Sequence, residues 1–141
     1  MAKNKKPTKR YTRKPVSIPI TSGLKDALAE DTYFSLMAME SGAVDVVTWK
    51  RMAKVLMTVS FATDEVSTVD KSDKVAIDSA VLTIKSISDR EVRTGQWHVT
   101  PVDIQSLSRG VTAADKAISA LDYRKLKQGY LSFISLMRSI K

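Results

Sequence analysis

The sequence contains no cysteine and only one histidine, His98. Without cysteine, the chain cannot form disulfides, thiol nucleophiles, iron–sulfur clusters or cysteine-ligated zinc sites. A single histidine also excludes a two-histidine metal site or a Ser-His-Asp triad within one chain. The sequence has no G-x-x-x-x-G-K-[ST] loop, no G-x-G-x-x-G and no H-E-x-x-H. We therefore expect a protein that is not an enzyme and that has no metal and no cofactor.

Long apolar runs are missing as well. No stretch approaches the roughly 20 consecutive apolar residues that cross a bilayer, and the N-terminal segment lacks the apolar centre of a signal peptide. The absence of cysteine is compatible with a reducing compartment, so we expect a cytoplasmic protein. A chain of 141 residues that is 43% hydrophobic suits one domain with a single core.

The positive charge is concentrated at the two ends of the chain. The formal net charge is +8; residues 1–14 contribute +7 and residues 122–141 contribute +4, whereas residues 15–121 carry −3. The first fourteen residues contain no acidic side chain. The central part of the chain is thus close to neutral, and the basic character belongs to its ends.

Residues 1–21 are predicted to be an extended or disordered basic arm. Pro7, Pro15 and Pro19 remove backbone donors and disfavour helix in the residues before them. Val16-Ser17-Ile18 alternates apolar and polar residues and could lie along the body as a short strand-like anchor. A basic segment with one aromatic ring is typical of arms that bind phosphates and stack on a base, and it lacks the apolar anchor that membrane attachment needs. The candidate nucleic-acid-binding residues of the arm are Lys3, Lys5, Lys6, Lys9, Arg10, Tyr11, Arg13 and Lys14.

Residues 22–141 are predicted to form a single all-α domain, a compact bundle of four to five helices. Ser22 is the expected N-cap of a first helix that stops at Gly42 and is kinked near Asp31. This helix is expected to bury Tyr33, Phe34, Leu36 and Met37.

Two further helices are predicted in the middle of the chain. Asp45 is the expected N-cap of the second helix, whose apolar residues recur at i, i+3, i+4 and i+7. Those residues are Trp49, Met52, Ala53, Leu56 and Val59, and the basic residues Lys50, Arg51 and Lys54 fall on the other side, as on a solvated face. The third helix ends at Gly95, which suits a left-handed conformation. Thr100 and Pro101 then mark the N-cap and first residue of the next helix, with Asp103 near its positive end.

The C-terminal part of the chain contains two apolar stripes that are out of phase, and each has the spacing of a heptad repeat. The stripes are Ile104, Leu107, Val111, Ala114, Ile118 and Leu121, and then Tyr123, Leu126, Tyr130, Phe133, Met137 and Ile140. One straight helix would place them on different faces, so we predict a sharp turn from Ser119 to Asp122, two residues that resemble a capping box. Gly129 indicates a close helix crossing. The stripes are also compatible with a homodimer.

Two further groups of residues are candidate binding sites. Arg124, Lys125 and Lys127 in the last helix could assist the arm at nucleic acid. Trp97, beside His98 and shortly after Arg93, could form a stacking platform for a base or a docking site for a partner protein. The alternative is that Trp97 covers the core and His98 is partly exposed.

The stretch Arg10-Tyr11-Thr12-Arg13-Lys14-Pro15-Val16 resembles the basic, tyrosine-containing, proline-ended openings of uncharacterised small helical proteins encoded by proteobacterial phages, prophages and plasmids. Arg93-Thr94-Gly95-Gln96 is a second point of similarity. The resemblance carries no established activity. It implies a genomic setting in which small proteins often act on nucleic acid or on host defence machinery.

These features leave two functions open. The first is a non-enzymatic protein that associates with nucleic acid by binding the phosphate backbone through its arm, largely without sequence specificity. The second is an inhibitor or adaptor that binds a host defence or regulatory protein through a face of the bundle. An acidic protein is a further candidate partner for the arm.

Overall fold

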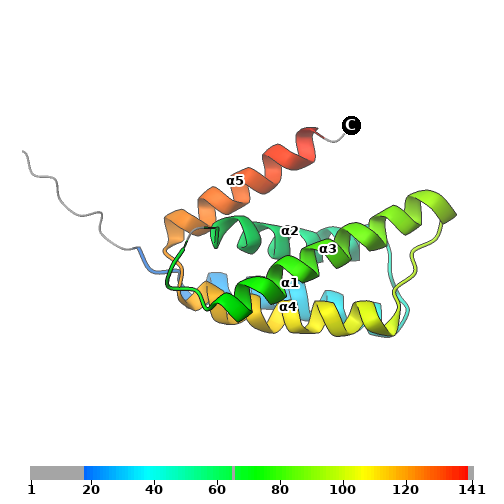
Figure 1. The fold of residues 1–141 in the computed structure, drawn as a ribbon, viewed down its shortest axis with the longest axis horizontal. Helices are drawn as coiled ribbons and strands as arrows, with labels where there is room; N and C mark the ends of the chain where they lie inside the picture. The colour runs from blue at the N-terminus through cyan, green and yellow to red at the C-terminus, as the bar shows by residue number, and fades with distance from the viewer. Residues whose placement is uncertain (1–17, 65, 140–141) are drawn as a thin grey trace, which may run out of the picture.

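The computed structural model describes residues 18–64 and 66–139, which form five α-helices and no β-strand (Figure 1). The helices are α1 (Ser22–Glu40), α2 (Val46–Ala62), α3 (Lys71–Thr94), α4 (Pro101–Ser119) and α5 (Tyr123–Ser139). The predicted all-α bundle of four to five helices is confirmed for this part of the chain. Of the predicted basic arm, residues 1–21, the structure describes only residues 18–21.

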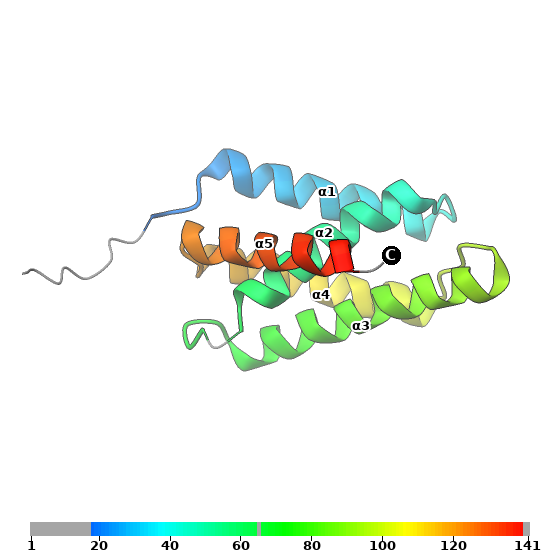
Figure 2. The ribbon, with the colours of Figure 1, turned by 90° about the horizontal axis from the view of Figure 1, so that it is seen from above.

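The second helix, α2, is the centre of the bundle. It contacts all four other helices; Figure 2 shows α1 and α3 on its two sides and α5 lying over it, and α4 packs from beneath. A helix surrounded in this way has to be apolar around most of its circumference. The sequence of α2 meets this condition, because its buried residues are Met52, Ala53, Val55, Leu56, Met57, Thr58, Val59 and Ala62.

Hydrogen bonds at the helix ends confirm several predicted caps. The Asp45 carboxylate accepts a hydrogen bond of 2.8 Å from the Thr48 backbone N–H at the start of α2. Gly95 ends α3 with a φ of 77°, in the left-handed region that favours glycine. Thr100 and Asp103 form a capping box at the start of α4, in which each side chain accepts from the backbone N–H of the other, at 3.1 and 3.0 Å.

Asp103 also ties α4 to α3. Its carboxylate lies 2.8 Å from the Arg90 guanidinium, which in turn donates to the His98 carbonyl in the connecting loop. Burial raises the pKa of Asp103, but hydrogen bonds from the Thr100 backbone and from Arg90 outweigh burial and hold this pKa below its ordinary value. The carboxylate is therefore ionised at neutral pH and fixes the α3–α4 connection.

The start and the course of α1 differ from the prediction. The N-cap is Thr21 rather than Ser22, since the Thr21 hydroxyl accepts the hydrogen bond from the Leu24 backbone N–H. The helix is also continuous through Asp31, where a kink was expected. Asp31 instead forms an ion pair with Lys54 of α2.

Four residues of α1 were expected in the core, and the prediction is wrong for three of them. Tyr33, Phe34 and Met37 are 41%, 63% and 60% exposed. The helix faces α2 and α4 with Thr32, Ser35, Leu36 and Met39, which have the i, i+3, i+4, i+7 spacing of one face. The buried face thus combines two small polar residues with Leu36 and Met39, and Tyr33, Phe34 and Met37 point outward.

The turn between α4 and α5 lies where the out-of-phase stripes predicted it. However, Ser119 is the last residue of α4 and does not cap α5, so the expected capping box is not formed. Asp122 alone has the capping role, because its carboxylate accepts a hydrogen bond of 2.6 Å from the Arg124 backbone N–H. Leu121 is buried in the turn and joins the core.

Gly129 brings α5 into close contact with the backbone of α2, as its position in the sequence indicated. A Cβ atom on Gly129 would overlap the Thr58 carbonyl oxygen and would lie 2.9 Å from both the Ala62 amide nitrogen and the Ala62 Cβ. Gly110 of α4 has the same role against α3, where a Cβ would overlap Ala80. Glycine is therefore required at both crossings for the helices to approach this closely.

Replacing Gly129 with alanine is expected to destabilise the bundle. Overpacking costs about 1–3 kcal/mol, against a gain of about 1 kcal/mol in helix propensity, so the free energy of unfolding should fall by up to about 2 kcal/mol. Urea denaturation followed by circular dichroism measures this change. Gly23→Ala is the matched control, because no atom lies within 4 Å of its added Cβ, and its stability should be unchanged or slightly raised. Equal stability of the two variants would contradict the close crossing.

Candidate functional site

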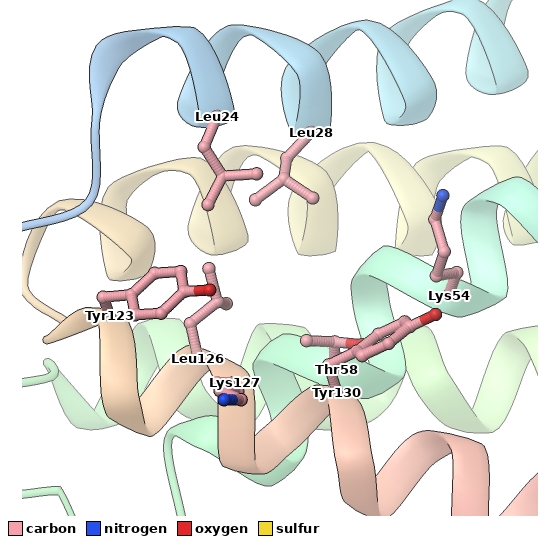
Figure 3. A pocket seen from close by; sticks show the side chains of 8 residues that line it. All are labelled: Leu24, Leu28, Lys54, Thr58, Tyr123, Leu126, Lys127 and Tyr130. Atoms are coloured by element: carbon pink, nitrogen blue, oxygen red, sulfur yellow. The ribbon is translucent and has the colours of Figure 1, made fainter.

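A groove lies between α1 and α5, with α2 as its floor (Figure 3). Its volume of about 310 Å³ is near the lower end of the range of small-molecule sites, about 300–1,000 Å³. The lining residues come from the first turns of α1, the middle of α2 and the first half of α5: Leu24, Leu28, Lys54, Thr58, Tyr123, Leu126, Lys127 and Tyr130. The groove is thus at the end of the bundle where α1 and α5 begin.

Two tyrosines and a lysine form the α5 wall of the groove. Tyr123, Lys127 and Tyr130 lie at i, i+4 and i+7 and therefore share one face of the helix. The adjacent face, which includes Leu126 and Phe133, is buried against α2. Tyr123 and Tyr130 remain 40% and 42% exposed, so parts of both rings are accessible to a ligand.

The two lysines of the groove differ in their partners. The Lys54 ammonium lies 3.0 Å from the Asp31 carboxylate, and both side chains are partly exposed. Exposed ion pairs contribute only about 0–1 kcal/mol, so an anionic ligand can compete with Asp31 for Lys54. Lys127 has no ion pair with any carboxylate in the described part of the chain. The groove therefore offers one fully available cation and one that is weakly held.

Thr58, on the floor of the groove, carries a buried hydroxyl without a hydrogen-bond partner among the described residues. The side chain is 4% exposed. Five other threonines donate to the carbonyl four residues earlier: Thr32, Thr63, Thr83, Thr94 and Thr112. Thr58 does not make this bond. An unpaired buried hydroxyl costs about 1–3 kcal/mol, which makes Thr58 an unexplained polar group in the floor of the groove.

The residues just before α1 are attached to the start of α5. The Ile18 N–H donates to the Asp122 carboxylate at 2.9 Å, and the Ile18 carbonyl accepts from the Tyr123 N–H at 2.8 Å. Pro19 pairs with Asp122 as an isolated antiparallel bridge, and Ile20 is buried. The predicted strand-like anchor is thus present at Ile18; Val16 and Ser17 lie outside the described residues.

The hydrogen bonds from the Ile18 and Arg124 backbones hold the pKa of Asp122 below its ordinary value, and the Arg124 charge acts in the same direction. The Asp122 carboxylate is therefore ionised at neutral pH. A single ionised side chain fixes both the start of α5 and the point at which the N-terminal segment joins the body.

The predicted nucleic-acid-binding residues fall into two groups. The candidates in the arm, Lys3, Lys5, Lys6, Lys9, Arg10, Tyr11, Arg13 and Lys14, lie outside the described residues. In α5, Arg124 lies 3.6 Å from the Asp122 carboxylate, Lys125 is exposed, and Lys127 lines the groove. Within their bounds, the helices α2 and α5 together contain seven lysines and arginines and no acidic residue. Six of these seven side chains are exposed, so the surface that α2 and α5 present to solvent, here called the cationic side, carries no acidic residue of these two helices.

The other candidate group, Arg93, Trp97 and His98, lies at the opposite end of the bundle from the groove, around the α3–α4 loop (Figure 1). Trp97 is partly buried, with its ring centroid 6.1 Å from that of Trp49. The Trp49 indole N–H donates to the Ile84 carbonyl. This is the alternative arrangement, in which Trp97 covers the core while His98 is exposed. Arg93 is exposed beside it, and binding of a partner here stays a prediction.

Sequence reasoning did not single out most of the groove. Tyr123 and Tyr130 were assigned to an apolar stripe, and Lys54 to a solvated basic cluster. A signal was nevertheless present, because tyrosine, lysine and tyrosine at i, i+4 and i+7 in α5 form a basic and aromatic face. The pairing of this face with Leu24 and Leu28 of α1 depends on tertiary packing, which periodicity does not reveal.

None of the helices in the described residues combines the length and the apolar character needed to cross a membrane. These residues also contain no group of three or more His, Asp or Glu side chains placed to hold a metal ion. Comparisons with family models, curated proteins and solved structures found no match to the chain. Function is therefore inferred from the chemistry of the surfaces described above.

Asp122→Ala is expected to release Ile18 from the start of α5. Amide hydrogen exchange, measured residue by residue by NMR, should become faster at Ile18 and Tyr123, while exchange in α3 stays unchanged. Because the pKa of Asp122 is lowered in the folded state, this attachment is intact above the ordinary carboxyl pKa and is lost as the pH falls through the lowered value. Asp115→Ala, at an exposed position of α4, is the control. Unchanged exchange at Ile18 in Asp122→Ala would rule out this role.

Proposed function

We propose that this protein is a non-enzymatic nucleic-acid-associated protein that binds the phosphate backbone through its basic N-terminal arm and the cationic side formed by α2 and α5. The observation that carries the proposal is the attachment of Ile18 to Asp122 at the start of α5. It connects the segment with seven cations in residues 1–14 to the end of the body that carries Lys125 and Lys127. The described part of the chain therefore begins, at Ile18, at the same end of the body as these lysines of α5.

The distribution of charge supports nucleic acid as the partner. All acidic residues of the helices lie in α1, α3 and α4, whose net charges are −3, +1 and 0, whereas α2 and α5 carry +3 and +4 and no acidic residue. Separation of charge of this kind provides a basic face for a polyanion. Contacts to phosphates carry no sequence information, so the expected binding through the arm is largely independent of sequence.

Removing residues 1–15 tests this function. If most of the seven cations meet duplex phosphates, the logarithm of the affinity falls by roughly five or six per decade of salt in the full chain, and the slope becomes much shallower without the arm. Fluorescence anisotropy with a labelled duplex across a salt series measures both slopes. A chain whose arm is scrambled in order but unchanged in composition should bind like the original. Unchanged affinity of the truncated chain at low salt would refute the proposal.

A second candidate function is protein binding through α1, and the exposure of Tyr33, Phe34 and Met37 favours it. Tyr33 and Phe34 lie four and three residues before Met37, so both side chains neighbour Met37 on the exposed surface of the helix. The residues of α1 carry a net charge of −3. This apolar patch with acidic surroundings suits a partner that has an apolar centre and a basic rim.

The double substitution Phe34→Ser and Met37→Ser is expected to abolish capture of such a partner from a nuclease-treated host lysate. The side chains are exposed, so the bundle should keep its stability. Val92→Ser is the matched control, because Val92 is 78% exposed on α3 and far from the patch in sequence. The α1 surface is excluded as the binding site if the double variant and the control capture the same protein equally well.

A further inference from the structure

We propose that the groove between α1 and α5 binds a base and its adjacent phosphate of a single-stranded nucleic acid. The inference rests on the proposed function and deepens it, because the arm alone would not distinguish single strands from duplexes. It assigns the groove to stacking on Tyr123 and Tyr130, with Lys54 and Lys127 at the phosphate. The other phosphates of the single-stranded nucleic acid would lie along the cationic side of α2 and α5.

The aromatic side chains support a base as the occupant. Every nucleobase has a π-face that stacks on aromatic rings, and such stacking does not depend on sequence. Tyr130 contacts Phe133, with ring centroids 6.3 Å apart, and the residue is 42% exposed. The ring is thus supported by the core while a face or edge remains available. Tyr123, two helical turns earlier on the same face of α5, is similarly exposed, at 40%.

The charge of the groove excludes the chain's own arm and favours a polyanion. Lys54 of α2 and Lys127 of α5 both line the groove, and seven cations of the arm would be repelled by them. Lys127 has no ion pair among the described residues, and Lys54 is held only by a partly exposed aspartate. A phosphate next to a stacked base supplies the missing anion without a change of fold.

The size and the polar floor of the groove favour one unpaired nucleotide over a duplex. In a duplex the bases are stacked on each other and their faces are not available to tyrosine rings. A volume of about 310 Å³ admits a small-molecule unit rather than a double helix. The Thr58 hydroxyl lies at this floor, 96% buried and without a partner, where a polar edge of a base can satisfy it after a small shift of the covering side chains.

The test compares an oligothymidylate of about 20 nucleotides, long enough to cover a typical single-strand site, with a duplex of the same length, using the full chain. Tyr130→Ala should lower the affinity for the single strand by roughly tenfold or more, the loss expected for one stacked base. Its affinity for the duplex should be unchanged. Tyr130→Phe keeps the ring and should retain single-strand binding.

Two matched controls isolate the groove. Tyr33→Ala removes a tyrosine of nearly the same exposure, 41% against 42%, from another face and should leave single-strand binding unchanged. Lys127→Gln and Lys125→Gln remove the same charge from the same helix, but only Lys127 lines the groove. Lys127→Gln should therefore weaken single-strand binding more than Lys125→Gln does. Both lysines are exposed, so this comparison stands even if Tyr130→Ala fails to fold.

The outcomes separate this inference from the proposed function. If the full chain binds single strand and duplex equally well, and the Tyr130 and Lys127 variants lose nothing beyond their controls, the groove inference is overturned while the function of the arm stands. If the full chain binds neither polymer, both fail. Dissociation of a homodimer by Tyr130→Ala in sedimentation, with nucleic-acid binding unchanged, would assign the groove to a second copy and overturn the inference.

Discussion

The contact on which the arrangement of the C-terminal helix depends is the crossing of Gly129 with the α2 backbone at Thr58 and Ala62. Because α5 has no side chain at this point, it lies directly on α2 and buries Leu126 and Phe133 against it. The same contact determines which face of α5 turns toward α1. The tyrosines and Lys127 consequently meet Leu24 and Leu28 across the groove.

The central position of α2 explains how an apolar core and a basic surface occur in the same helix pair. Its buried residues satisfy α1, α3, α4 and α5 together, and its three cations lie at positions that the neighbours do not cover completely. Neither α2 nor α5 contains a carboxylate that would offset these cations. Lys54 and Arg124 instead form ion pairs with Asp31 and Asp122, which belong to other segments. The cationic side thus arises because α2 and α5 contain no acidic residue and pack against each other.

Most of the fold could be predicted from the sequence, because its signals are local. Asp45, Gly95 and Thr100 act within one turn of their own helices, and the phase change between the two C-terminal stripes requires a turn. The buried face of α1 was not predictable in this way. Hydrophobicity favours Phe34 and Met37 as core residues, but the space beside α2 and α4 accepts Thr32 and Ser35 instead. The groove was missed for a related reason, since its two walls are nearly a hundred residues apart in sequence.

The attachment of α5 has a consequence for the groove. Among the helices, α5 packs mainly on α2, whereas α2, α3 and α4 also contact one another, with α1 packed against α2 and α4. Proteins open in cooperative units whose free energies can be lower than that of global unfolding, and α5 is held to the rest of the bundle by α2 and by the residues just before α1. When α5 separates, one wall of the groove leaves with it, while the other four helices keep their shared core. The groove therefore exists only while α5 is packed on α2, and local opening of α5 removes it even when the other four helices remain folded.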